Sequence, residues 1–520
     1  MIKIGKIIPL ALVVLMGIGC NPNGSTAGSE AATDTTYSGD DASDFVENET
    51  WSSAINIVWD GTNVTVTGSA DGVSVTHSNG YVTVKSTVKN IEYIVNGSGT
   101  GQLSIYSDYK FKLSFEGLTL ACPDGPAINN QSSKTCYAVL GGTNTLSDGA
   151  SYASSSEDRK AAFFSEGQIC FSGSGSLSVT GNYKHALASD DYIRLCSGTG
   201  TIDLIAKVSD GMHANDGIII NDGTLTINAV GEGIQCDTSS VLISGGTLDI
   251  TSTTDKGILA YANIDISGGT TTITSKYKCI KTESNLTVSG GTITAVATGS
   301  SSSSGTPEGI EAKGTITISG GKVYAQANDD AINAGGNLTI TGGYVMAYST
   351  GNDGIDANGN CYIKGGVVYA IGAREPEVGI DANTEGGYKL YVQGGTLVAI
   401  GGLENNASLT QSCYSASSLS KGTWYALYSS SDVALVFKTP ASLSTSTLVV
   451  STSGTASLKS AVTTSGGSSI LNGYALSDAT VSGGTAITLS SYTGGNAGGG
   501  GPGGGGPGGG GPGGGRPGGW

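Results

Sequence analysis

The chain has 520 residues, a formal net charge of −17, 85 glycines and only 13% charged residues. Globular domains usually contain about a quarter charged residues. Helix-forming residues are scarce here, whereas Thr, Val, Ile and Tyr are common, which favours strands. The acidic balance argues against nucleic acid as a partner and favours cations or a basic protein.

The first residues have the features of an export signal. Two lysines precede an apolar run over residues 7–18 that is too short to span a membrane comfortably. The run ends with GIGC at Cys20 and resembles a bacterial lipoprotein signal, although Gly17 stands where that pattern usually has Leu. We therefore expect residues 1–20 to be a lipoprotein signal peptide and Cys20 to be lipidated.

Both ends of the mature chain have compositions that cannot form a core. Residues 21–50 begin with a polar stretch and are expected to form a flexible tether from the lipid. Residues 494–520 consist almost entirely of Gly and Pro and are expected to be a disordered tail. With the lipid anchor, these segments predict a lipoprotein of the cell envelope that is exposed at the outer membrane or cell surface.

An apolar residue that usually follows glycine recurs along the middle of the chain. Its intervals are roughly 22 to 25 residues, except where a serine-rich insertion at 300–305 lengthens one repeat. A fixed period in this range indicates a solenoid. Ile128 fits as the anchor of one earlier coil. The repeat anchors are Phe163, Leu187, Met212, Ile234, Ile258, Ile280, Ile310, Ile332, Ile355 and Ile380.

A Gly-Gly pair follows most of the anchors and precedes a run of alternating residues, as in KVYAQA at 322–327. Alternation predicts strands with one buried face, and the glycines predict sharp corners. The repeat is too short for the four strands of a propeller blade. We therefore expect an all-β, right-handed parallel β-helix of about ten coils over residues 51–402, with a β-rich segment over 403–493 packed on it.

Eight cysteines follow Cys20. They form no Cys-x-x-Cys motif and no cluster with histidine, so a zinc site is not expected. The repeat does not align the cysteines of adjacent coils in one column, as a series of disulfides would require. Most are expected to be buried small apolar residues. Cys122 and Cys136 are the one pair for which a disulfide is plausible.

Stacked coils turn equivalent positions into columns of side chains about 4.8 Å apart. Acids and amides collect near the anchors in two groups, which Lys256, Lys278 and Lys281 separate. Like charges at this spacing repel, and calcium, which takes six to eight oxygen ligands, would compensate them. Where no ion binds, the lysines would supply the positive charge. The candidate calcium ligands are Asp190, Asp191, Asp210, Asn215, Asp216 and Glu232 in the first group and Asp329, Asp330, Asn352, Asp353, Asp356 and Asp381 in the second. Because Asn and Asp are also ordinary turn residues, a simple turn role remains the alternative for each.

Three tyrosines are expected to point outward from successive coils. Tyr324, Tyr348 and Tyr369 belong to an apolar, partly aromatic stripe on the outside of the solenoid. Exposed apolar patches usually mark an interaction site, and aromatic rings can pack against the C–H faces of sugars. These three residues are the predicted carbohydrate-binding platform. The alternative is that the β-rich C-terminal segment covers them.

The recurring DGI and I-x-GG coils, opened by LSFEGLTLACPDGPAI at 113–128, resemble a bacterial carbohydrate-binding family with a pectate-lyase-like β-helix. The resemblance runs from about residue 50 to 490. It implies a secreted or surface-anchored protein that binds calcium and recognises plant cell-wall polysaccharides such as cellulose and acidic pectin. Lys256, Lys278 and Val378 replace acids that the family pattern expects, which argues against calcium in the middle coils.

The predicted function is therefore non-catalytic, calcium-dependent binding of plant-cell-wall-type polysaccharide by a monomer at the cell surface. A polysaccharide lyase is the first alternative, because lyases of this shape use calcium and an Arg or Lys base. Arg374 is the best candidate for that base, unless it simply pairs with Glu375 or Glu377. A structural surface adhesin is the other alternative. No catalytic residue is assigned.

Overall fold

The computed structural model describes residues 41–301 and 305–495, and every structural statement below concerns these residues. The predicted signal peptide, Cys20, most of the predicted tether and nearly all of the predicted tail lie outside them. No helix in the described ranges is long and apolar enough to cross a membrane. The helical elements there are three short 3-10 turns: η1 (Ala42–Asp44), η2 (Val46–Asn48) and η3 (Leu471–Gly473). The described chain is all-β, as predicted.

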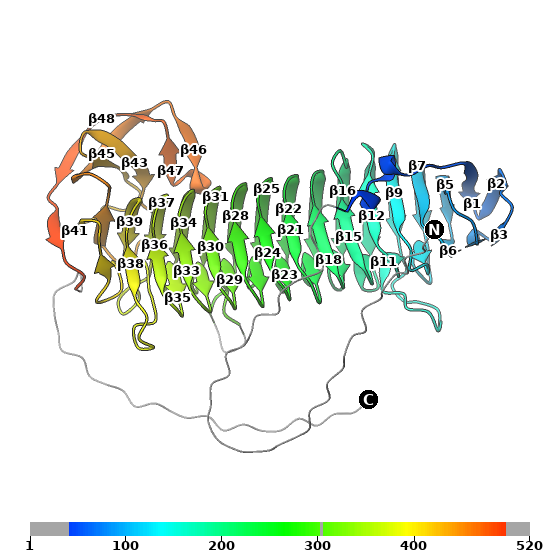
Figure 1. Ribbon diagram of the computed structural model, residues 1–520, viewed down its shortest axis with the longest axis horizontal. Coiled ribbons are helices and arrows are strands. Elements are labelled where there is room, and N and C mark those ends of the chain that lie inside the picture. Colours follow the sequence, from blue (N-terminus) through cyan, green and yellow to red (C-terminus); the bar gives the residue numbers. More distant parts are fainter. Residues whose placement is uncertain (1–40, 302–304, 496–520) are drawn as a thin grey trace, which may run out of the picture. The chain divides into compact units, whose positions relative to one another are not determined.

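Most coils of the solenoid contribute three short strands, and each of these strands pairs in parallel with its equivalent in the next coil (Figure 1). One coil contains β32 (Ile332–Ala334), β33 (Leu338–Ile340) and β34 (Tyr344–Ser349). They pair with β35 (Ile355–Ala357), β36 (Cys361–Ile363) and β37 (Val367–Ile371), respectively. This pairing confirms a parallel β-helix.

The first stack of strands, here called the anchor stack, carries the repeat anchors. It is a sheet of 13 strands, more than the ten coils predicted, because the repeat continues toward the N-terminus without its glycine landmarks. Besides β32 and β35, its strands are β3 (Val73–Ser78), β4 (Tyr81–Ser86), β6 (Gln102–Ser107), β8 (Ile128–Asn130), β11 (Ala161–Ser165), β14 (His185–Ser189), β17 (Met212–Ala214), β20 (Ile234–Cys236), β23 (Ile258–Ala260), β26 (Ile280–Thr282) and β29 (Ile310–Ala312).

The other two stacks belong to one 30-stranded sheet. Three long strands, β1 (Ser53–Gly61), β5 (Ile91–Thr100) and β7 (Phe111–Ala121), run through both stacks at the N-terminal end. With β33 and β36, the second stack contains β9 (Cys136–Gly141), β12 (Ile169–Ser172), β15 (Tyr192–Leu195), β18 (Gly217–Ile220), β21 (Val241–Ile243), β24 (Ile264–Ile266), β27 (Leu286–Val288), β30 (Ile316–Ile318), β38 (Leu390–Val392) and β40 (Ser408–Leu409). With β34 and β37, the long stack contains β10 (Thr143–Ser147), β13 (Ser176–Gly181), β16 (Thr201–Ala206), β19 (Thr224–Ala229), β22 (Thr247–Ser252), β25 (Thr270–Ser275), β28 (Thr292–Ala297), β31 (Lys322–Ala327) and β39 (Thr396–Ile400).

The anchors predicted from the period pair with one another in register along the anchor stack. The series runs from Phe163, opposite Leu187, to Ile355, opposite Ile380. Ile128 precedes Phe163, as expected, and Leu403 continues the series after Ile380. All are buried in the core. The spacing alone therefore predicted the register, because an inward apolar residue is required once per coil.

The Gly-Gly corners are required by close backbone contact and by positive φ. Gly343 has a φ of +79°, which L-residues rarely adopt. At its neighbour Gly342, a Cβ atom would lie 2.3 Å from the backbone oxygen of Ser319 in the preceding coil. A side chain would be strained at the second glycine and would clash with the backbone at the first. The Gly-Gly pair therefore recurs in coil after coil.

The N-terminal end of the solenoid is closed by hairpins. Strand β1 pairs with β2 (Asn63–Thr67) in an antiparallel arrangement, and β3 pairs with β4 in the same way. These hairpins end the parallel stacks with two short edge strands, β2 and β3, and short edges limit pairing with another chain.

The eight cysteines in the described residues are buried and free. Cys136 lies in the solenoid core, whereas the Sγ atom of Cys122 lies 3.6 Å from a carboxylate oxygen of Asp124. The predicted Cys122–Cys136 disulfide is therefore wrong. The expectation of buried apolar cysteines is confirmed.

Residues 41–50, which the sequence assigns to the flexible tether, instead pack on the outside of the second stack. Asp44 is 1% exposed and forms an ion pair of 2.8 Å with Arg194, which is buried to the same extent. Phe45 lies under the guanidinium group, with its ring centroid 4.6 Å away. Trp51 stacks edge-on against Tyr137. The segment is held in place because Asp44 pairs with the buried Arg194, a contact that no sequence pattern predicted.

The C-terminal segment first extends the solenoid and then folds back over it. Strands β41 (Cys413–Ser417), β44 (Thr447–Ser451) and β49 (Ser490–Tyr492) pair antiparallel, with β44 joined to β39. A separate six-stranded sheet lies over β31, β34, β37 and β39 (Figure 1, orange). Its strands are β46 (Ser468–Ile470), β47 (Ala475–Ser477), β43 (Asp432–Lys438), β42 (Trp424–Ser429), β45 (Ala456–Ser465) and β48 (Thr480–Ile487).

Candidate functional site

The second group of acids occupies two neighbouring columns at the C-terminal end of the anchor stack. Asp330 and Asp353 lie two residues before their anchors, and Asp356 and Asp381 lie one residue after theirs. Glu404 follows the anchor Leu403 and continues the column of Asp356 and Asp381. We call these five residues the acid ladder. The sequence analysis missed Glu404 because it ended the repeat one anchor too early.

The acid ladder lacks basic partners. Within the described ranges, no Lys, Arg or His forms an ion pair with any of its five carboxylates. Burial and the carboxylates of Asp356 and Asp353 raise the pKa of Asp330 to about 9. Burial likewise raises the pKa of Asp353 to about 8 and that of Asp356 to about 7. At neutral pH the ladder must therefore hold protons or bind a cation.

Amide groups orient the carboxylates of the ladder. Asp330 accepts hydrogen bonds from the backbone N–H of Asp353 at 3.1 Å and from Nδ2 of Asn333 at 3.0 Å. Nδ2 of Asn352 donates to Asp329 at 2.8 Å, which leaves the amide oxygen of Asn352 available as a ligand. The oxygen atoms that remain are the hard ligands that calcium prefers.

The oxygen atoms of the ladder are ligands of the kind that calcium prefers, but they are widely spaced. Among the described residues, the ladder does not bring the oxygens of three acids within 4.8 Å of one another. An ion there would thus be shared by few carboxylates and would take its other oxygens from amides, backbone carbonyls or water. The residues present are compatible with such a site.

Several acids of the first group are paired with basic side chains of the protein. Asp190 pairs with Lys160 at 2.5 Å, and Glu232 pairs with Lys256 at 3.0 Å. Nδ2 of Asn215 donates to Asp190 at 3.4 Å. Within the described part of the chain Asp191 and Asp216 have no such base, and burial followed by the charge of Asp216 raises the pKa of Asp191. These ion pairs offset the charges of Asp190 and Glu232, and the calcium patch over Asp190, Asp191, Asp210, Asn215, Asp216 and Glu232 stays a prediction.

In the middle coils, lysine side chains pair with acids of neighbouring positions. Lys278 contacts Glu308 at 2.8 Å and Glu311 at 3.0 Å. Lys281 pairs with Glu283 at 2.6 Å. These pairs remove Glu308 and Glu311 from the acid ladder, which therefore begins one coil later.

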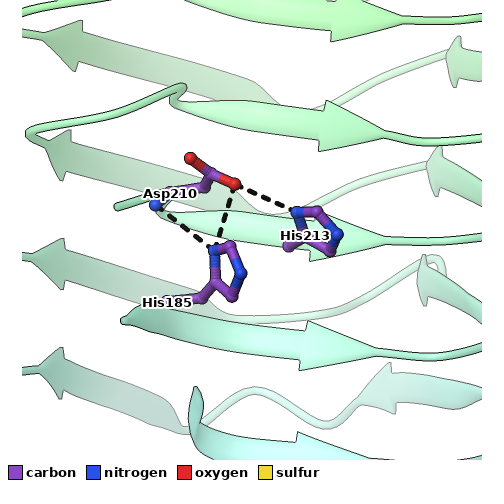
Figure 2. Close-up of side chains that lie close together, drawn as sticks. All are labelled: His185, Asp210 and His213. Atoms are coloured by element: carbon purple, nitrogen blue, oxygen red, sulfur yellow. Dashed lines mark hydrogen bonds and ion pairs between the residues drawn. The ribbon is translucent and has the colours of Figure 1, made fainter. Parts of the chain in front are cut away.

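Two histidines converge on one carboxylate in the first group (Figure 2). Nδ1 of His185 on β14 and Nδ1 of His213 on β17 each lie 3.0 Å from Oδ2 of Asp210. Burial opposes the charge of Asp210, but the hydrogen bonds from the histidines hold its pKa well below the usual range. On the other side of its ring, Nε2 of His213 lies 3.2 Å from Asp237. No sequence motif joins these residues, because they come from three coils.

The predicted carbohydrate-binding platform is wrong. Tyr324, Tyr348 and Tyr369 are at most 6% exposed, because the six-stranded sheet covers them. The ring of Tyr369 packs edge-on against Phe437, with centroids 5.2 Å apart. The hydroxyl of Tyr348 donates to the backbone oxygen of Ser442 at 3.1 Å. The stripe is a second hydrophobic core, which is the alternative left open by the sequence.

A groove opens at the N-terminal end of the solenoid, where the anchor stack turns into the long strands. Lys89, Tyr109 and Lys134 occupy equivalent positions in three consecutive coils. Nζ of Lys89 lies 5.0 Å from the ring centroid of Tyr109, which is 38% exposed. The groove has a volume of about 620 Å³ and is also lined by Lys110, Asp108, Asp191 and neutral polar residues. Within the described chain, neither Lys89 nor Lys134 has an acidic partner.

The sequence analysis missed this groove because the early coils lack the Gly-Gly landmark. Extending the anchor register back through Ile128 to Leu103 would have aligned Tyr109 with Lys134, whereas Lys89 aligns with Tyr109 only through the pairing of β5 with β7. The lysines are far apart in the chain and come together only through stacking.

A second aromatic surface lies on the second stack. The rings of Tyr362 and Tyr391 stack with centroids 4.9 Å apart and an interplanar angle of 12°. Nζ of Lys364 lies 4.7 Å from the ring centroid of Tyr362. Both rings are half-buried by each other, so they offer less free face than Tyr109 does.

A polar cavity of about 400 Å³ lies beside the end of the acid ladder. Its lining includes Arg374, Glu377, Glu404 and Thr447. Arg374 is exposed and, within the described residues, forms no ion pair with Glu375 or Glu377. The unpaired guanidinium offers a contact for an anion, and Glu377 and Glu404 lie in the same lining.

Comparison with known proteins assigns the chain to a family. A solved structure that matches, the polysaccharide lyase-like protein from C. thermocellum in its gadolinium derivative, is 22% identical and covers 51% of this chain and 96% of its own, with a TM-score of 0.38. That likeness is too low to carry an argument. No curated protein matches the chain. A family model described as "Carbohydrate-binding domain-containing protein" matches residues 78–269 and 260–354, which together span more than half of the chain. The chain therefore belongs to this family of carbohydrate-binding domain-containing proteins.

Proposed function

We propose that this protein binds acidic plant-cell-wall-type polysaccharide at the cell surface without cleaving it, and that calcium braces the acid ladder. Membership of the carbohydrate-binding family supports a glycan ligand. The groove of Lys89, Tyr109 and Lys134 is the observation that favours an acidic glycan as the ligand. There, unpaired lysines flank an exposed ring, although the chain has a net charge of −17.

The groove offers two complementary kinds of contact. The exposed face of Tyr109 can pack on the C–H face of a sugar ring, and the lysines on either side can pair with uronate carboxylates. Exposed ion pairs contribute only about 0.2–1 kcal/mol each. Affinity would therefore come from several contacts repeated along one chain, which suits a polymer better than a monosaccharide.

Calcium has a separate, structural role in this proposal. Among the described residues the ladder acids lack basic partners, and burial together with neighbouring carboxylates raises the pKa values of Asp330, Asp353 and Asp356. A bound cation would remove the repulsion between Asp353, Asp356 and Asp381 in adjacent coils. It would join these coils at the end of the solenoid where the six-stranded sheet packs.

Retention on immobilised polygalacturonate and on cellulose tests the groove. The variant K89A/Y109A/K134A should lose polygalacturonate retention while its melting temperature stays unchanged, because the three side chains have few partners. The matched control Y362A/Y391A removes the other aromatic surface and should retain the ligand. Undiminished binding by the groove variant would refute the groove, and loss in the control would move the site to the second stack.

Polysaccharide lyase activity is the second candidate, because Arg374 lies unpaired in a cavity beside the acid ladder. A lyase would release an unsaturated uronate that absorbs in the ultraviolet. We expect no such absorbance from wild-type protein with polygalacturonate and calcium. Absorbance that disappears in R374A would establish the lyase instead. A structural adhesin would show neither retention nor product.

A further inference from the structure

We propose that His185, Asp210 and His213 form a binding site for one divalent first-row transition metal ion, such as Zn²⁺, separate from the acid ladder. Two of the three histidines in the chain meet here. Within the described chain, these residues are the one group of at least three His, Cys, Asp or Glu residues whose ligand atoms lie within 4.8 Å of one another. The expectation from cysteine spacing that the protein has no zinc site did not consider this arrangement.

The donor atoms suit such an ion in kind and spacing. Both Nδ1 atoms face the same Asp210 oxygen at 3.0 Å (Figure 2). Zinc binds imidazole nitrogen at about 2.0–2.1 Å and carboxylate oxygen at about 2.0–2.2 Å. Ligand atoms around a tetrahedral ion with such bonds are separated by roughly 3.3 Å. Small side-chain shifts would therefore admit the ion between them, and two nitrogen ligands favour a transition metal over calcium.

His213 supplies an independent reason. Its ring has a carboxylate at each nitrogen, with Asp210 at Nδ1 and Asp237 at Nε2. A neutral imidazole carries only one N–H, so one of these contacts would set a lone pair against a carboxylate. The arrangement is satisfied either by a second proton on the ring or by a metal ion at Nδ1. With the metal bound, the remaining proton sits on Nε2 and is donated to Asp237.

This contact to Asp237 has the form of the outer hydrogen bonds found around metal-bound histidines, which fix the tautomer and orient the ring. His185 differs, because its buried Nε2 has no hydrogen-bond partner in the described structure. Its ring is therefore held only through the Asp210 side. An ion at this point would join the coil of β14 to the coil of β17, and Asp237 would extend the link to the coil of β20.

Three protein ligands leave a fourth position for water or for a ligand oxygen. Burial limits the access of solvent to that fourth position. His185 and Asp210 are almost fully buried, whereas the side chain of Asp237 is 38% exposed. We therefore assign the ion a structural role, with access from the Asp237 side.

Metal binding by the full chain tests the site directly. Protein stripped with chelator is titrated with Co²⁺ or Zn²⁺ alone, in excess calcium so that the acid ladder does not contribute. Wild type should bind one equivalent, show visible Co²⁺ absorption typical of low coordination by nitrogen and oxygen, and gain thermal stability with Zn²⁺. No bound equivalent or no spectral change in wild type would overturn the proposal.

Matched variants locate the ion. H185Q/H213Q should lose the equivalent and the spectrum, whereas H77Q, which changes an exposed histidine on β3, should keep both. D237N leaves the ligands in place and should weaken Zn²⁺ affinity by about 10–100-fold. The D237N variant also tests the site if the double histidine variant does not fold. D353N/D356N should bind Zn²⁺ normally. Full binding by folded H185Q/H213Q, or unchanged affinity in D237N, would refute the assignment.

Discussion

The hydroxyl of Tyr369 donates a hydrogen bond to the backbone oxygen of Lys438, 3.1 Å away, and so ties the solenoid wall to the sheet that folds back over it. Tyr369 is fully buried at this contact. A ring that alternation alone placed on the surface is thus part of a core shared by two segments far apart in the sequence.

Tyr369→Ala should destabilise the protein by about 3–5 kcal/mol, by analogy with other buried aromatic truncations. The loss comes from the cavity beside Phe437 and from the unpaired Lys438 carbonyl. Tyr388→Ala, at a residue that is 42% exposed, serves as the control and should change stability by no more than about 0.5 kcal/mol. Chemical denaturation measures both. Equal stability of the two variants would contradict the burial of Tyr369.

Removal of calcium should lower the melting temperature, because an ion bound only by the folded state stabilises it by mass action. D353N/D356N should abolish most of the difference between calcium and chelator. D190N, at an acid that pairs with Lys160, should retain that difference. Identical melting curves of wild type with and without chelator would rule out calcium at the ladder.

The metal-free protein should lose stability as the pH rises from about 5 to 9. The folded-state pKa values of Asp330, Asp353 and Asp356 are raised to about 9, 8 and 7, whereas an unfolded Asp titrates near 3.9. The folded state therefore holds more protons in this range, and deprotonation removes that stabilisation. The slope approaches about 1.4 kcal/mol per pH unit for each group protonated only in the folded state.

Urea unfolding at several pH values, in chelator, measures this slope. Calcium should flatten it, because the cation stabilises the charged carboxylates. D330N should reduce it in the absence of calcium. A stability that rises with pH over this range in chelator would show that the ladder acids are charged without an ion.

Breaking the buried pair between Asp44 and Arg194 should release the N-terminal segment from the second stack. Removing one partner of a buried ion pair costs about 3–5 kcal/mol, because the other charge is left uncompensated. D44A should therefore expose residues 41–51 to proteases while the solenoid remains folded. D41A is the control, since Asp41 is exposed and only caps η1. Equal protection of both variants would show that the segment is held by other contacts.

Cys20→Ser should abolish lipid attachment. We propose that Cys20 is the lipidated first residue of a surface-exposed lipoprotein, on the basis of the GIGC motif after an apolar run. Detergent phase partitioning of cells expressing either form measures the change, and wild type should enter the detergent phase while the variant does not. A wild-type protein that stays in the aqueous phase would contradict the lipid anchor.

The period of the sequence was sufficient to predict the parallel β-helix and the pairing of its anchors. The reason is physical: each coil must place one apolar residue inward and turn a tight corner, so Ile332, Ile355 and Ile380 recur with the glycines that follow them. The same register aligned Asp330 with Asp353 and Asp356 with Asp381, which defined the ladder. Glu404 and the coils before Ile128 escaped notice only because their landmarks are weaker.

Only the tertiary structure decided which columns are exposed and which charges are paired. A strand pattern shows that Tyr369 leaves the solenoid core, but not that Phe437 covers it. A column of acids shows that Asp210 needs compensation, but not that His185 and His213 provide it, because side chains from different coils meet according to rotamer and packing. Lys89, Tyr109 and Lys134 likewise become one groove only when three coils stack. The period of a repeat is a property of the sequence, whereas burial and charge pairing depend on contacts between residues that are far apart in the sequence.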